Sequence, residues 1–111
     1  MDTKIIGKTT IAPEVLVSIA QLATLSIDGV CRLTPGPRDV NTLFKKGLAE
    51  GINIVVENNV VYADIYVVLQ HDVIVRDVCK NIQNQVSRSI EERVGLEIGH
   101  INVHVADIRS C

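Results

Sequence analysis

The feature of this sequence that most constrains its fold is a pair of alternating segments separated by two asparagines. From Ile52 to Glu57, and again from Val60 to Leu69, apolar residues recur at every second position. That period is typical of a strand with one buried face. Asn58 and Asn59 tolerate the positive φ angles that a two-residue turn requires. The segments therefore predict a β-hairpin, whose apolar face other elements must cover.

Two helices are predicted on either side of this hairpin in the sequence. The first runs from Pro13 to Ser26, because proline suits the first helical position and the Asp28-Gly29 pair can end the helix. The second runs from Ile74 to Val94, where apolar residues recur with the helical period until Gly95. Either helix can supply an apolar band to cover the hairpin.

The remaining segments complete the predicted fold. Val30 to Leu33 and Ile98 to Ile108 are predicted strands, residues 34–38 form a loop rich in proline and glycine, and a helical turn is expected between Val40 and Ala49. The order α-β-β-β-α-β predicts an α+β fold, a two-layer α/β sandwich whose mixed sheet carries both helices on one face. We expect a single domain over residues 1–111, because a chain of this length builds one core.

Composition argues against several classes of protein. The chain has 11 Lys and Arg against 13 Asp and Glu, with two tyrosines, one phenylalanine and no tryptophan. A nucleic-acid partner is therefore not expected, because binding one usually needs a basic surface or aromatic stacking platforms. Dinucleotide-binding and P-loop motifs are also absent. No apolar run reaches the roughly 20 residues of a membrane span, so direct membrane insertion is not expected.

The residues that carry chemistry in other proteins suggest no catalytic, cofactor or metal site here, and no enzyme is expected. His100 and His104 share a strand face, but four positions along a strand separate them by about 13 Å, too far for two ligands of one metal. Cys79 falls on the apolar band of the second helix. Three cysteines without a CxxC pair favour free thiols in a reducing cytoplasm, with Cys31 in a short strand and Cys111 mobile.

The first helix offers one candidate interaction surface. A narrow polar stripe contains Glu14, Ser18, Gln21 and Thr24. Val17 and Leu25 fall within this stripe, so we expect both to be exposed and available for contact with another chain.

The sheet offers a second candidate interaction surface. Tyr62, Asp64 and Tyr66 alternate with the apolar face of their strand, so they point away from the expected helices. Asn102 and His104 of the last strand are expected to join them on this open face. Ordinary cross-strand pairing is enough to explain exposed residues at these positions. Two tyrosines beside a carboxylate would also suit contact with a partner protein.

The chain also carries a series of short motifs in a characteristic order. They are Gly7-Lys8-Thr9-Thr10-Ile11-Ala12-Pro13-Glu14-Val15, Asp28-Gly29-Val30, Val60-Val61-Tyr62-Ala63-Asp64-Ile65-Tyr66-Val67, Asn81-Ile82-Gln83, Val94-Gly95-Leu96 and Ile101-Asn102-Val103-His104-Val105. Over about residues 5 to 108, this series resembles the alkaline-shock-protein family of bacterial cell-envelope stress response proteins.

The resemblance implies a non-enzymatic interaction protein that contributes to cell-envelope homeostasis. It implies a homo-oligomer in the cytoplasm or peripherally at the inner membrane surface, docked to a small integral-membrane anchor protein. It supplies no catalytic residues, cofactor or metal. The alternative is a small-ligand-binding protein or an enzyme that uses the open sheet face, with Asp64, His104 and Cys31. A deep pocket lined by these three residues would favour that alternative.

Overall fold

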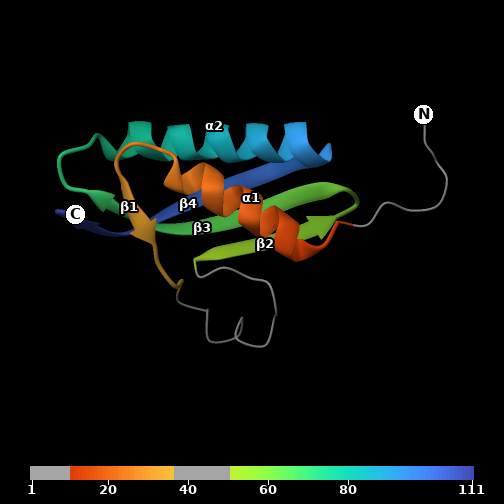
Figure 1. The fold of residues 1–111 in the computed structure, drawn as a ribbon, viewed down its shortest axis with the longest axis horizontal. Helices are drawn as coiled ribbons and strands as arrows, with labels where there is room; N and C mark the ends of the chain where they lie inside the picture. Colours follow the sequence, from red (N-terminus) through yellow and green to blue (C-terminus); the bar gives the residue numbers. More distant parts are fainter. Residues whose placement is uncertain (1–10, 37–50) are drawn as a thin grey trace.

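A computed structural model describes residues 11–36 and 51–111 of the chain (Figure 1). Within them, two helices lie on one face of a four-stranded sheet. The elements are α1 (Pro13–Leu25), β1 (Val30–Leu33), β2 (Ile52–Glu57), β3 (Val60–Gln70), α2 (Val75–Val94) and β4 (Glu97–Arg109). This order confirms the predicted α+β fold, and each bound differs from its prediction by at most one residue. The helical turn expected between Val40 and Ala49 lies outside the described residues.

β3 is the central strand of the sheet. β2 pairs antiparallel with residues 60–65 of β3, and β1 pairs antiparallel with residues 67–69, so both share one edge of that strand. β4 runs parallel along the other edge. The hairpin turn between β2 and β3 is formed by Asn58 and Asn59, with φ angles of 53° and 65°. The sheet is therefore mixed, as the sequence predicted.

The core lies between the sheet and the two helices. The helix-facing residues of β3 are all fully buried: Val61, Ala63, Ile65, Val67 and Leu69. α2 contributes Val78, Ile82, Val86 and Ile90, and α1 contributes Leu16, Val17, Ala20 and Ala23. Burying one large apolar side chain contributes about 1.5–3 kcal/mol, so this layer dominates the stability of the fold.

The rotation of α1 about its own axis differs from the prediction. Val17 is only 2% exposed and Thr24 is fully buried, although both were expected on the solvent side. α1 packs against α2 as well as against β1 and β2, so its buried arc is wider than contact with one surface would require. The expectation that Val17 is available for contacts is therefore wrong, whereas Leu25 is exposed.

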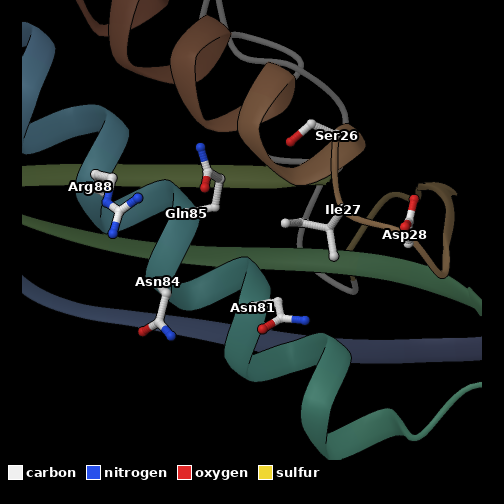
Figure 2. A pocket seen from close by; sticks show the side chains of 7 residues that line it. All are labelled: Ser26, Ile27, Asp28, Asn81, Asn84, Gln85 and Arg88. Carbon is white, nitrogen blue, oxygen red and sulfur yellow. The ribbon is translucent and has the colours of Figure 1, made fainter.

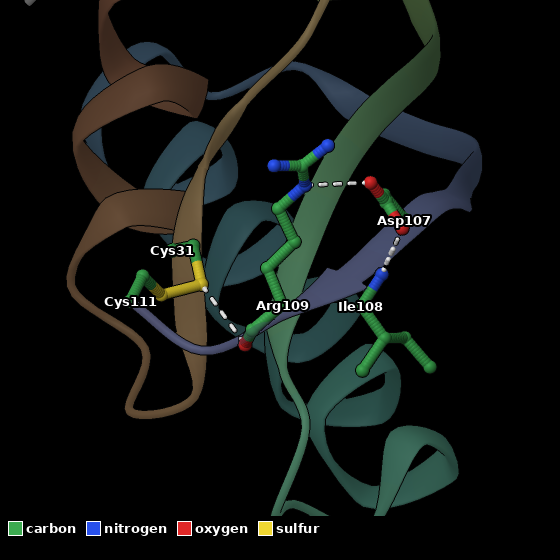
Figure 3. Close-up of a disulfide and its surroundings, with 5 residues drawn as sticks. All are labelled: Cys31, Asp107, Ile108, Arg109 and Cys111. Carbon is green, nitrogen blue, oxygen red and sulfur yellow. Dashed lines mark hydrogen bonds and ion pairs between the residues drawn. A yellow bond between two sulfur atoms is a disulfide. The ribbon is translucent and has the colours of Figure 1, made fainter.

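The cysteines also differ from expectation, because two of them are paired. Cys31 of β1 and Cys111, which follows β4, form a disulfide with their Cα atoms 6.0 Å apart (Figure 3). The expectation of three free thiols is therefore wrong. The two residues are 80 positions apart in the sequence and meet because β1 and β4 flank the same end of β3. Cys79 is free, as expected, and burial raises the pKa of its thiol.

Candidate functional site

The sheet face turned away from the helices carries a cluster of polar and aromatic side chains. Residues paired across neighbouring strands point to the same face, so the pairing of β3 with β4 brings these side chains together. This open-face cluster consists of Tyr62, Asp64 and Tyr66 of β3 with His100, Asn102 and His104 of β4. The structure thus unites the sheet residues that the sequence predicted and adds His100.

Asp64 is the centre of the open-face cluster. Its Oδ1 accepts a hydrogen bond of 3.2 Å from Nδ2 of Asn102 and lies 3.0 Å from Nε2 of His104. Partial burial raises the pKa of the carboxyl, but these hydrogen bonds and the charges of His104 and His100 outweigh it, so the pKa lies below its usual 3.8. The side chains of Asp64 and His104 are 41% and 44% exposed, so a partner can reach the pair.

The tyrosine rings are held in place on either side of Asp64. The ring of Tyr66 stacks on His104 with centroids 4.5 Å apart, and the ring of Tyr62 meets His100 edge-on at 5.0 Å. Gly36 and Gly99 leave room for these rings, because a Cβ at either position would collide with ring atoms. The half-buried rings are therefore already ordered before any partner binds.

The exposed side of α1 forms a second surface. Val15, Leu22 and Leu25 are 44%, 69% and 44% exposed. Their spacing of seven and three residues places them on one side of the helix, together with Ser18. We call these three apolar residues the α1 stripe. Leu25 was predicted here, whereas Val15 and Leu22 were not, because they lie outside the polar stripe that defined the predicted surface.

A groove between α1 and α2 runs beside the α1 stripe. Its apolar part encloses about 220 Å³ and is lined by Ile19, Leu22, Ala23, Ser26, Gln85, Ser89 and Arg93. Its polar part encloses about 370 Å³ and is lined by Ser26, Ile27, Asp28, Asn81, Asn84, Gln85 and Arg88 (Figure 2). Both cavities lie on the helix side of the sheet. Neither contains Asp64, His104 or Cys31, the residues of the ligand-binding alternative.

Within residues 11–36 and 51–111, no group of three or more His, Cys, Asp and Glu side chains is placed to hold a metal ion. In the same part of the chain, no helix has the length and apolar character needed to span a bilayer.

Comparison with known proteins identifies the family of the chain. The family model for alkaline shock protein 23, described as having a cell envelope-related function, matches residues 1–110. The chain belongs to the alkaline shock protein 23 family. This match confirms the resemblance found in the sequence motifs. The alkaline shock protein 23 family is thus described by a relation to the cell envelope rather than by an enzymatic activity.

Individual relatives support this membership. The uncharacterized protein Spy1535 of Streptococcus pyogenes is 35% identical over 109 residues, which cover 97% of this chain and 84% of the relative. The uncharacterized protein YqhY of Bacillus subtilis is 26% identical and covers 94% of this chain and 78% of its own length. Among solved structures, a variant of MamM CTD has a TM-score of 0.54 at 11% identity, covering 86% of this chain and 98% of that one. At that identity, the likeness shows a shared fold only.

Proposed function

We propose that this protein is a non-enzymatic interaction protein that contributes to cell-envelope homeostasis through self-association and docking to a membrane-anchored partner. The envelope-related function of its family supports the cellular setting. The observation that carries the proposal is the α1 stripe, three large apolar side chains exposed side by side on one helix.

The α1 stripe suits contact with a second copy of the chain. Apolar surface gains about 25 cal/mol for each Å² removed from water. A stripe that meets its own copy across a two-fold axis is complementary to itself, as most homodimer interfaces are. The apolar part of the neighbouring groove, at Ile19 and Ala23, offers the exposed Leu22 of the second copy a place to pack.

The open-face cluster suits a different protein. Tyrosine is enriched at protein interfaces, and the rings of Tyr62 and Tyr66 are already held by their histidine neighbours. The exposed pair of Asp64 and His104 adds charge, which selects a partner of complementary sign more than it adds affinity. We assign docking of the membrane-anchored partner to this face and self-association to α1.

The test of self-association is a double substitution in the α1 stripe. Leu22→Asp with Leu25→Asp places carboxylates in the proposed apolar contact, where unpaired charges cost several kcal/mol. Both residues are exposed, so the variant should keep the far-ultraviolet circular dichroism spectrum of the wild type. Light scattering after size-exclusion chromatography should give an oligomer for the wild type and a monomer for the variant.

Ile74→Ser is the matched control for this measurement. Ile74 is 65% exposed at the start of α2, so the change also removes exposed apolar surface, but outside α1. It should leave the oligomer intact. A monomeric wild type, or a double variant with the mass of the wild type, would rule out self-association through the α1 stripe.

A further inference from the structure

Cys31 occupies an irregular position in β1. The pairing of β1 with β3 shifts between Val30 and Arg32, so Cys31 falls at a bulge. Bulges commonly redirect a side chain out of the regular alternation of a strand. Here the sulfur of Cys31 meets Cys111 beyond the end of β4, and it lies 4.0 Å from the carbonyl oxygen of Arg109 (Figure 3).

The disulfide lies across the end of the central strand. At this end, the backbone N–H of Gln70 donates to Gly29, and that of His71 donates to Arg109. These two bonds join β3 to the residues on either side of it. The pair of Cys31 and Cys111, which we call the strap, connects the same two sides covalently.

We propose that the strap is a reversible thiol–disulfide site that low-molecular-weight disulfides oxidise and thiols reduce. One cysteine thiolate attacks a sulfur of the oxidant RSSR, which forms a mixed disulfide and releases one RSH after proton uptake. The second cysteine displaces the remaining RS group, which leaves as a second RSH. Each cysteine gives up one hydrogen, and the two electrons reduce one RSSR to two RSH.

The surroundings of the three cysteines make this reaction selective. Cys111 is exposed and Cys31 is half-buried, so a small disulfide can reach Cys111 directly. Cys79 lies on α2, where burial disfavours its thiolate, so it is not expected to react.

Closing the strap should stabilise this end of the sheet. A cross-link between residues 80 positions apart removes much of the conformational freedom of the unfolded chain. β1 has only four residues, and among the described strands it pairs with β3 alone, so it has few other contacts within that part of the sheet. The oxidation state should therefore control how readily β1 opens.

The experiment compares fully reduced protein before and after treatment with oxidised glutathione. Intact-mass spectrometry should show the loss of two hydrogen atoms, and peptide mapping should find Cys31 joined to Cys111 within one chain. The melting temperature should rise by roughly 10 °C, and hydrogen exchange in residues 30–33 should slow. Excess reduced glutathione should reverse all three changes.

Three substitutions separate the strap from general cysteine oxidation. Cys79→Ser should respond as the wild type does, whereas Cys31→Ser and Cys111→Ser should lose the rise in melting temperature. The proposal is overturned by a mixed disulfide with glutathione that persists, by disulfide-linked dimers as the main product, or by equal melting temperatures of the oxidised and reduced forms.

Discussion

At the scale of single residues, the titration of Asp64 in the open-face cluster makes the stability of the protein depend on pH. Its pKa is lowered in the folded protein, so the carboxylate favours folding at pH values above its usual 3.8. That contribution is lost as the pH falls through the lowered pKa. His104→Ala removes a hydrogen bond and a charge that lower the pKa, so the pKa of Asp64 should rise.

Nuclear magnetic resonance titration of the Asp64 carboxyl carbon checks this prediction. The midpoint should lie below 3.8 in the wild type and higher in His104→Ala. His71→Ala is the control, because His71 is exposed and is not among the groups that shift the pKa of Asp64. A wild-type midpoint above 3.8, or equal midpoints in wild type and His104→Ala, would contradict the described hydrogen bonding.

Strand alternation was enough to predict the residues of the open-face cluster, but not their contacts. The period of two placed Tyr62, Asp64 and Tyr66 on one face, because it depends only on backbone geometry. The pairing of Tyr66 with His104 depends on the register between β3 and β4, which no single strand specifies. The place of His100 beside Tyr62 likewise follows only from that register.

At the scale of elements, the start of α2 lacks a side-chain cap. Ile74 occupies the N-cap position with extended backbone angles, is 65% exposed and offers no hydrogen-bond acceptor in its side chain. Ile74→Ser should stabilise the protein by about 1 kcal/mol, because the hydroxyl can accept a bond from an unpaired N–H of the first turn.

Urea denaturation monitored by circular dichroism measures this effect. The midpoint should move to higher urea concentration with an unchanged slope, since the surface exposed on unfolding stays nearly the same. Ile74→Ala is the control, because alanine removes the same apolar side chain without supplying a cap. Equal midpoints for the serine and alanine variants would show that no capping bond forms.

The strands were predicted more accurately than the orientation of α1. Helical periodicity shows that a buried side exists, but not how wide it is. α1 contacts α2 as well as β1 and β2, so its buried side is wide enough to include Val17 and Thr24. A buried hydroxyl usually has a hydrogen-bond partner, so a threonine in a polar stripe is expected to face solvent. The buried hydroxyl of Thr24 has no partner among the described residues.

At the scale of the whole molecule, the two faces of the sheet have different roles. One face builds the core with both helices, and the other presents the open-face cluster. The order of elements predicted this two-layer arrangement. The strap was not predictable, because the meeting of Cys31 and Cys111 depends on which edge of β3 each neighbouring strand occupies.

Docking at the envelope is predicted to depend on the open-face cluster as a whole. Asp64→Lys reverses the central charge of the cluster on a side chain that is 41% exposed, so the core should remain intact. Glu92→Lys makes the same change of charge on the exposed side of α2, on the other side of the sheet. Only the first variant should lose a partner that binds the open face, because only it places a lysine among the tyrosines and histidines.

The share of each tagged protein that is recovered with the membrane fraction of its native host tests docking through the open face directly. The wild type and Glu92→Lys should be recovered there with the same integral-membrane protein, whereas Asp64→Lys should be absent from the membrane fraction and should not bind that protein. Wild type found entirely outside the membrane fraction, or Asp64→Lys retained in it with the same partner, would contradict docking through the open face.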